Sequence, residues 1–206
     1  TAALAASKRG HRVIMTEETD WIGGQLTSQA VPPDEHQWIE QFGCTKTYRQ
    51  FRNRVKDYYR SHYPLKEEAR QNDRLNPGNG WVSRLCHEPK VALTVLQEML
   101  VPYTSSGRLQ IYTNYKAILA SVEGDDVFSV TVQHTENEKR MKLEGQYYLD
   151  ATEVGDLLPL AGVESSSMDH QIVEDDFGRL GICGKMYSKD DAVKLSFTRY
   201  WDICGN

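Results

Sequence analysis

Residues 11–27, HRVIMTEETDWIGGQLT, constrain the fold of this chain more than any other segment. Residues 13–15 form a short apolar run, which is typical of a parallel strand covered on both faces. Glu17 stands where this run ends, and Gly23 and Gly24 follow in a sequence that favours a tight turn. The segment therefore predicts a buried strand, an acidic residue at its carboxyl end and a glycine turn.

A helix is expected directly before this strand. Residues 1–9 are rich in alanine, the strongest helix former, and Gly10 suits the C-cap of that helix. In a dinucleotide-binding βαβ unit, a carboxylate at the end of the second strand accepts hydrogen bonds from the ribose hydroxyls. The order of helix, turn, strand and Glu17 thus predicts the second half of a nucleotide-binding unit.

Three segments together resemble a known family. TEETDWIGGQLTS, NPGNGWVSRLCHEPKVAL and DATEVGDLLPLAG resemble FAD-dependent oxidoreductases of the glutathione-reductase and succinate-dehydrogenase-flavoprotein type, over roughly residues 1–163. The resemblance implies an α/β fold, a Rossmann-like FAD-binding domain with a three-stranded β-meander and a helical insertion. It also implies FAD as cofactor and hydride transfer from a small-molecule substrate, of a class that the sequence leaves open, to the flavin.

One element of that family is missing from the sequence. The family opens with a strand and a GxGxxG turn whose backbone amides hold the pyrophosphate, whereas no GxGxxG occurs in these 206 residues. We therefore expect a fragment that begins inside the first helix of the domain. Two alternatives stay open: a non-catalytic nucleotide-binding or interaction module without the pyrophosphate loop, and an NAD-dependent enzyme.

The resemblance also implies a division of the chain into parts. Residues 1–30 and 81–163 would form the FAD-binding domain, which would be incomplete at its N-terminus. Residues 31–80 would form a helical insertion on the substrate side, and residues 164–206 carry no motif that assigns them.

Most of the expected cofactor contacts follow from the resemblance. Gln25 and Thr27 would lie near the isoalloxazine, with the alternative that polar side chains of this loop only cap neighbouring backbone groups. The full set of residues expected to bind the cofactor is Glu17, Glu18, Gly23, Gly24, Gln25, Thr27, Arg84, Ala117, Ala151, Thr152, Gly155 and Asp156.

Two residues precede a predicted helix over 90–103. Arg84 could pair with the pyrophosphate by charge and hydrogen bonds. His87 is the candidate catalytic residue, as a proton shuttle beside the flavin. The alternative is that His87 caps the helix or hydrogen-bonds inside the core. Pro89 suits the first turn of this helix, where its missing N–H costs nothing.

Strands are predicted over 109–113, 116–122, 127–133 and 140–149. By its position in the family's β-meander, the backbone of Ala117 would contact the adenine edge, with plain sheet packing as the alternative.

The segment 150–156 closes the last predicted strand. In the family the main chain passes close to the nucleotide here, which requires small residues such as Ala151 and Thr152. Relatives usually have Gly where this chain has Glu153. Gly155 and Asp156 then precede a short apolar run, and Asp156 could instead be a helix N-cap.

Residues 46–63 read as an amphipathic helix with arginines and aromatic residues interleaved. We expect a packed helix with a solvated basic face. A nucleic-acid site and an arginine that faces a carboxylate substrate are the alternatives.

The composition narrows the possible partners. A net charge of −5 gives no electrostatic reason to expect nucleic acid, and no apolar run approaches the length of about 20 residues that a membrane helix needs. The expected partner is a small-molecule substrate, with no nucleic acid and no membrane, and the sequence carries no signal for the oligomeric state.

The cysteines point to a reducing compartment. Four cysteines lie far apart without CxxC spacing, as expected for a cytoplasmic protein rather than a disulfide framework. A zinc site would need Cys44, Cys86 and His87 to converge, and their spacing departs from zinc-ligand patterns, so no metal is expected.

Overall fold

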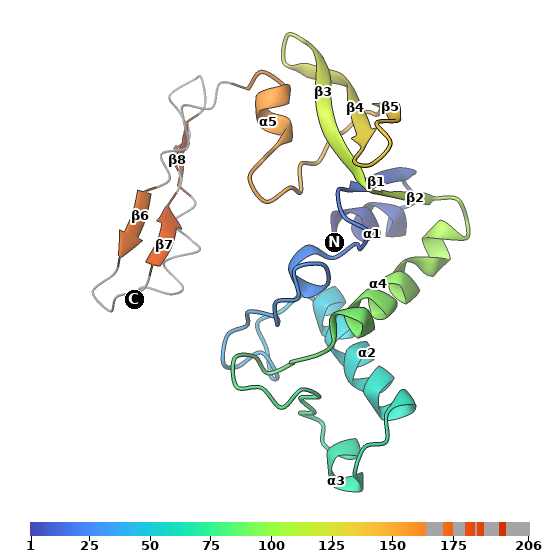
Figure 1. The fold of residues 1–206 in the computed structure, drawn as a ribbon, viewed down its shortest axis with the longest axis vertical. Helices are drawn as coiled ribbons and strands as arrows, with labels where there is room; N and C mark the ends of the chain where they lie inside the picture. Colours follow the sequence, from blue (N-terminus) through green and yellow to red (C-terminus); the bar gives the residue numbers. More distant parts are fainter. Residues whose placement is uncertain (164–170, 175–179, 184, 188–193, 197–206) are drawn as a thin grey trace. The chain divides into compact units, whose positions relative to one another are not determined.

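The structure is a computed structural model that describes residues 1–163, 171–174, 180–183, 185–187 and 194–196 (Figure 1). It mixes helices and strands, as expected for an α/β protein. The chain divides into two compact units, which are described separately below. The first comprises Thr1–Lys116 with His134–Lys139, and the second comprises Ala117–Gln133 with Arg140–Asn206.

The first unit is built on a parallel pair of strands. Strand β1, Val13–Glu17, pairs with β2, Leu109–Thr113, in a register that sets Val13 opposite Leu109. Helix α1, Ala2–Lys8, leads into β1, and helix α4, Pro89–Thr104, leads into β2. Parallel neighbours need such a crossover connection. The predicted strand, the helix before it and the helix before β2 are all present within one residue of the expected bounds.

Strand β1 is less buried than the sequence predicts. Val13 and Met15 pack against the core, but Ile14 is 46% exposed. Successive side chains of a strand point to opposite faces, so Ile14 lies on the face away from that core. The expectation of a strand covered on both faces is therefore wrong for the described part of this unit.

Helices α2 and α4 form the core of the first unit. Helix α2, Lys46–His62, starts at Thr45, whose Oγ1 accepts a hydrogen bond from Tyr48 N at 3.2 Å. It packs along α4 (Figure 1). The buried cluster consists of Leu4, Ile22, Phe51, Val55, Tyr59, Leu75, Leu85, Val91, Ala92, Val95, Met99, Leu100 and Leu109.

The expected solvated basic face of α2 is wrong for two of its cations. Arg52 and Lys56 are buried, with 0% and 3% of their surface exposed. They lie four residues apart on one side of the helix and meet acidic residues of the preceding loop, which replace water as their partners. After α2 come the short helix α3, Glu67–Arg70, and a loop that leads to α4.

The second unit contains a three-stranded sheet in the order β3-β4-β5. Its strands are β3, Tyr115–Glu123, β4, Asp126–His134, and β5, Arg140–Glu144; residues 115–116 and 134 of the first two belong to the first unit. Strand β5 pairs antiparallel with β4.

Strand β5 ends five residues earlier than predicted. Tyr148 Oη accepts from Gly145 N at 2.8 Å and donates to Phe128 O at 2.8 Å. The Tyr148 hydroxyl is thus tied back to β4, and residues 145–149 form no strand, so the predicted extension to Leu149 is wrong.

The rest of the second unit holds short elements. Helix α5 spans Leu157–Leu160. Two antiparallel pairs follow, β6, Gln171–Glu174, with β7, Leu180–Cys183, and then β8, Lys185–Tyr187, with β9, Lys194–Ser196. They belong to the segment that the sequence left unassigned.

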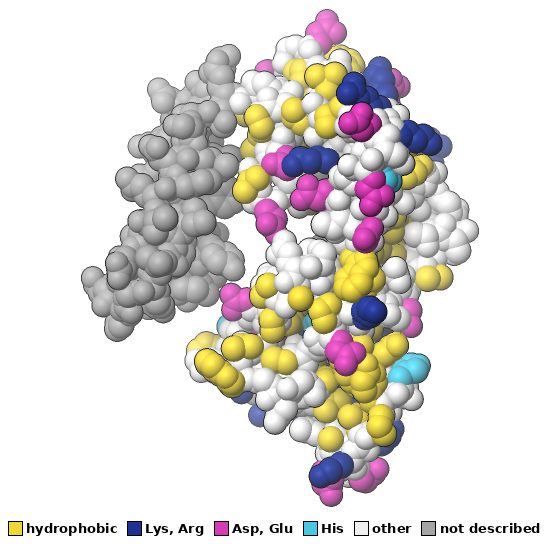
Figure 2. Space-filling view, viewed as in Figure 1, with side chains coloured by type: hydrophobic (Ala, Val, Ile, Leu, Met, Phe, Trp, Pro, Cys, Tyr) yellow, Lys and Arg dark blue, Asp and Glu magenta, His cyan; other side chains and the backbone are white. Residues whose placement is uncertain are grey.

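The described surface carries charges of both signs. Lys and Arg side chains are interspersed with Asp and Glu on the face shown in Figure 2. Among the described helices, none has both the length and the apolar character that crossing a lipid bilayer requires.

Replacing Leu109 by alanine tests the core. Leu109 is 2% exposed, so Leu109→Ala should lower the free energy of unfolding by about 2–5 kcal/mol, measured by urea denaturation. Leu119→Ala is the matched control in another strand, because Leu119 is 58% exposed, and it should change stability by less than about 0.5 kcal/mol. Equal losses in the two variants would contradict this core.

Candidate functional site

The glycine turn after β1 packs directly on α4. Gly23 has a φ of 116°, and a Cβ at this position would lie 2.7 Å from Leu96 Cδ1 and 2.8 Å from Thr27 Oγ1. Only glycine combines this backbone angle with so close an approach. Gly24, with a φ of 52°, opens the 3₁₀ helix η1, Gly24–Leu26, which also contains the exposed Gln25. The turn is thus held at a fixed distance from α4.

The hydroxyl groups of this loop bind its own backbone. Thr27 is 1% exposed, and its Oγ1 donates to Ile22 O at 2.8 Å. Ser28 Oγ donates to Gly24 O at 3.4 Å. These bonds match the capping alternative that the sequence left open, and they shape the wall of a pocket.

A pocket of about 420 Å³ lies between this loop and the first turn of α4. Its lining residues are Trp21, Thr27, Ser28, Ala30, Glu88, Pro89 and Lys90. The N-terminus of a 16-residue helix attracts negative charge, and the N-cap residue Glu88 makes no side-chain cap bond there. The α4 side of the pocket therefore presents both the ammonium group of Lys90 and the carboxylate of Glu88.

Glu17 ends β1 with one carboxylate oxygen uncommitted. Its Oε1 accepts hydrogen bonds from Thr19 N at 3.0 Å and from Thr19 Oγ1 at 2.9 Å. Its Oε2 accepts none from the described residues, so it can receive a ligand hydroxyl. The neighbouring Glu18 lies 3.6 Å from Lys116 Nζ, and both side chains are more than half exposed, so this ion pair is weak.

Two tyrosines of α2 and its C-cap fix the turn before α4. Tyr59 Oη accepts from Glu88 N at 2.8 Å, and Tyr63 Oη donates to Glu88 Oε2 at 2.5 Å. The bond to Glu88 raises the pKa of Tyr63 to about 12. Sequence reasoning missed both roles. The two tyrosines are four residues apart, about one helical turn, which places them on the same side. This spacing is equally typical of residues that only pack in the core.

His87 lies against α2 and is partly buried. Its Nδ1 is 3.2 Å from Glu88 O, and its ring meets Phe51 edge-on with centroids 6.1 Å apart. Its Nε2 is buried and has no partner among the described residues. Burial lowers the pKa of His87, and Glu35 opposes this effect. The neutral imidazole is therefore favoured.

Arg84 and two cysteines are the remaining candidates for ligand or metal binding in the first unit. Arg84 is exposed and makes no hydrogen bond or ion pair with the described residues, which leaves its guanidinium available for an anion. Cys44 and Cys86 are free thiols. Within the described ranges, no three His, Cys, Asp or Glu side chains are arranged to hold a metal ion.

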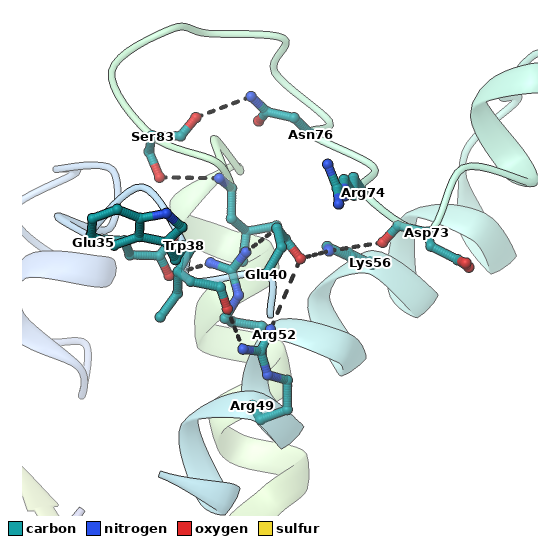
Figure 3. Close-up of polar contacts among 12 residues, drawn as sticks. Glu35, Trp38, Glu40, Arg49, Arg52, Lys56, Asp73, Arg74, Asn76 and Ser83 are labelled. Atoms are coloured by element: carbon teal, nitrogen blue, oxygen red, sulfur yellow. Dashed lines mark hydrogen bonds and ion pairs between the residues drawn. The ribbon is translucent and has the colours of Figure 1, made fainter. Parts of the chain in front are cut away.

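A buried charge cluster joins the loop before α2 to that helix (Figure 3). Arg52 donates to Glu35 and to Glu40. Lys56 Nζ donates to Glu40 Oε2 at 2.9 Å and to Asp73 O at 3.0 Å. Burial alone would raise the pKa of Glu40, but Lys56 and Arg52 outweigh it and lower this pKa. Neither glutamate belongs to a motif that the sequence would reveal.

In the second unit, Asp150 organises the turn that follows the sheet. Its Oδ1 accepts from Thr152 N at 2.9 Å and from Thr152 Oγ1 at 2.7 Å, and its Oδ2 accepts from Leu157 N at 2.9 Å. Asp156 N donates to Thr152 Oγ1 at 2.8 Å. Asp156 occupies the N-cap of α5 without a side-chain cap bond, so Asp150 serves the cap role that the sequence offered to Asp156.

The turn that Asp150 organises also contains small residues. Ala151 and Thr152 are exposed, and Gly155 has a φ of 74° with Leu158 Cδ1 only 2.9 Å from where a Cβ would stand. Ala117 is half-buried in β3.

The expected site residues thus fall into two groups. The first unit holds Glu17, Glu18, Gly23, Gly24, Gln25, Thr27, Arg84 and His87, and the second holds Ala117, Ala151, Thr152, Gly155 and Asp156. Within the first unit, the structure brings the glycine turn and Thr27 together with the start of α4.

Thr27→Val tests the glycine loop. The variant leaves the buried carbonyl of Ile22 without its donor, so the free energy of unfolding should fall by about 1–3 kcal/mol in chemical denaturation. Ser28→Ala should cost less than about 0.5 kcal/mol, because the Ser28 bond is long and exposed. A Thr27→Val variant as stable as the wild type would refute this assignment.

The order of the Asp150 turn should depend on pH. Burial raises the pKa of Asp150, but hydrogen bonds from Thr152 and Leu157 outweigh it and lower the pKa. The stabilisation is therefore complete above the ordinary pKa of an aspartate and is lost as the pH falls through the lowered value. Amide exchange of Thr152 and Leu157, measured by NMR, should accelerate relative to the rest of the sheet over that acidic range. In Asp150→Asn this pH dependence should vanish, and its persistence would contradict the role of Asp150.

Comparison with known proteins identifies the family of this chain. None of the curated proteins matches it. Among solved structures, L-lysine 6-monooxygenase from Pseudomonas syringae is similar with a TM-score of 0.30 and 18% identity, over 88% of this chain. The chain spans 40% of the length of that enzyme. The family model described as FAD dependent oxidoreductase matches residues 1–191. Because this match covers most of the chain, the protein belongs to the FAD dependent oxidoreductase family, and its cofactor is FAD.

Proposed function

We propose that this chain is part of an oxidoreductase in which a small-molecule substrate gives a hydride to FAD. The observation that carries the proposal is Glu17, whose Oε2 is uncommitted at the carboxyl end of a parallel strand. A carboxylate in this position suits the ribose hydroxyls of an adenine-containing cofactor. FAD itself supplies the electron chemistry when bound, and the protein supplies binding, orientation and protons.

The described residues fit such a cofactor. At Gly24 nothing lies within 4 Å of where a Cβ would stand, so a ligand can approach the turn closely there, whereas the same side of Gly23 is filled by Leu96 and Thr27. Lys90 at the start of α4 and the exposed Arg84 offer positive charge for phosphate groups. Glu18, Gln25 and Thr27 belong to the same segment and complete the proposed contacts of the first unit.

The arrangement of strands supports a Rossmann-like assignment. The pair β1 and β2 with the α4 crossover corresponds to a βαβ unit, and β3-β4-β5 corresponds to the family's β-meander. In this assignment the backbone of Ala117 lies by the adenine. Ala151, Thr152, Gly155 and Asp156 form the turn beside the nucleotide.

The domain division is proposed on the same basis. Residues 1–30 and 81–163 form the FAD-binding part, and 31–80, which contains α2 and α3, form the insertion on the substrate side. The scattered cysteines and the free thiols of Cys44 and Cys86 support a reducing, cytoplasmic location.

His87 is the proposed acid–base residue. Its buried Nε2 can accept or deliver a proton, and burial lowers its pKa so that the neutral form is available as a base. The Tyr59 and Tyr63 bonds to Glu88 hold the backbone next to it. Proton transfer by a placed histidine contributes about 10²–10⁴-fold to a rate.

A second candidate is a nucleotide-binding module without catalysis. The observation that favours it is the absence of a GxGxxG sequence from all 206 residues. The two candidates differ in flavin uptake, because the module would fail to bind added FAD while the oxidoreductase would bind it.

Titration of the full chain with FAD tests the proposal. Glu17→Gln should weaken FAD binding by about 1.5–3 kcal/mol, the contribution of one hydrogen bond to a charged group, which is about tenfold to a hundredfold in Kd. Glu98→Gln, an exposed change on α4, should leave the Kd unchanged. A wild-type chain that takes up no FAD, or equal affinities for wild type and Glu17→Gln, would overturn the proposal.

A further inference from the structure

Four side chains of the first unit carry a buried polar atom with no hydrogen-bond partner among the described residues. One is Oγ of Ser7 on α1, and the other three are Oε2 of Glu35, Nε of Arg52 and Nε2 of His87. The side chains of Glu35 and Arg52 are 2% and 0% exposed. Buried polar atoms in proteins are nearly always satisfied by protein or by an ordered water, so each of the three atoms beside α2 calls for a partner.

A chain of contacts connects Glu35 to His87. Tyr48 Oη donates to Glu35 Oε1 at 2.5 Å, and the Tyr48 ring stacks on Phe51 with centroids 6.0 Å apart. Phe51 in turn meets the His87 ring. Arg52 follows Phe51 on α2 and donates to the same Glu35 oxygen that Tyr48 uses. Glu35 and Arg52 are thus connected to His87 through Tyr48 and Phe51, and the charges of both act on His87.

The hydrogen-bonding capacities of the three atoms are complementary. His87 Nδ1 lies against the carbonyl of Glu88, which can only accept, so the neutral ring carries its proton on Nδ1 and leaves Nε2 as an acceptor. Glu35 Oε2 is a second acceptor, and Arg52 Nε–H is a donor. One water can accept from Arg52 and donate to both acceptors, which gives it the three bonds typical of a buried water.

We propose that one buried water binds Glu35 Oε2, Arg52 Nε and His87 Nε2, and that Glu35 acts through it as a positioning residue for His87. The bridging water does not depend on the proposed function. Only the positioning role of Glu35 does, because it requires His87 to be the acid–base residue. When His87 gains a proton, Nε2 donates to the water and the water donates to Glu35. The water and the Glu35 carboxylate thus support both protonation states.

The charges around His87 agree with this arrangement. Burial lowers the pKa of His87, Glu35 raises it and Arg52 lowers it. The backbone carbonyl of Glu88 raises the pKa of His87 through its hydrogen bond. Tyr48 stays neutral because burial and Glu35 raise its pKa. Glu35 and Glu40 balance Arg52 and Lys56 in charge, so loss of Glu35 leaves His87 facing a net positive cluster.

The test is an NMR titration of the full chain with ¹⁵N-labelled histidine and no flavin. The His87 signal is assigned by its loss in His87→Gln. In the wild type, neutral His87 should carry its proton on Nδ1. In Glu35→Gln the titration midpoint of His87 should move to lower pH, because the counter-charge is gone. Glu40→Gln removes the other carboxylate that binds Arg52, and it should move the midpoint less.

Two results would overturn the proposal. One is a wild-type tautomer with the proton on Nε2, which needs no variant and so holds even if Glu35→Gln does not fold. The other is a folded Glu35→Gln chain with the wild-type midpoint. Neither result involves flavin, so failure here leaves the FAD titration as an independent test of the proposed function.

Discussion

The packing of α4 is the interaction on which the rest of the first unit depends. This helix contacts α1, α2, η1 and β2, and its residues Val91, Ala92 and Val95 are almost wholly buried. Its C-terminal end delivers the chain to β2, which makes the parallel pairing with β1 possible. Its side chain Leu96 meets the backbone of Gly23, and its N-terminus lines the pocket. One helix thus positions the strand pair, the glycine turn and the candidate site.

The buried charges beside α2 have a different role. Replacing a buried ion pair by apolar residues often leaves stability unchanged or improved, because desolvation offsets the attraction. Removing one partner is costly, since a lone buried charge is left behind. The Glu35, Glu40, Arg52 and Lys56 cluster therefore fixes where the loop before α2 lies more than it adds stability. Through Glu35 that loop also reaches the surroundings of His87.

The sequence predicted those features that local patterns encode. The helices over 46–62 and 89–104 and the strands β1 and β2 follow from periodicity, capping and glycine chemistry, and they agree with the structure within one or two residues. The turn at Gly23 was predictable because a Gly-Gly pair directly after a strand favours a tight turn. The family resemblance predicted FAD as the cofactor, and the family match confirms this prediction.

The remaining features depend on contacts between distant residues. Glu35 and Glu40 look like ordinary surface carboxylates, and nothing local reveals that Arg52 and Lys56 are buried against them. The same holds for Tyr148, which bonds to Phe128 twenty residues earlier and ends β5 early. At the start of α5, Asp150 and not the N-cap residue Asp156 accepts the side-chain hydrogen bond from Leu157 N. Such pairings are set by tertiary structure, which overrides local preference.

The proposed FAD site depends on Glu17 binding the ribose of the cofactor. A crystal structure of this chain with FAD tests it most directly. We expect an oxygen of the Glu17 carboxylate to lie within about 3 Å of a ribose hydroxyl, beside the Gly23 turn. A bound FAD whose ribose is held by other residues, with Glu17 turned to solvent, would contradict it.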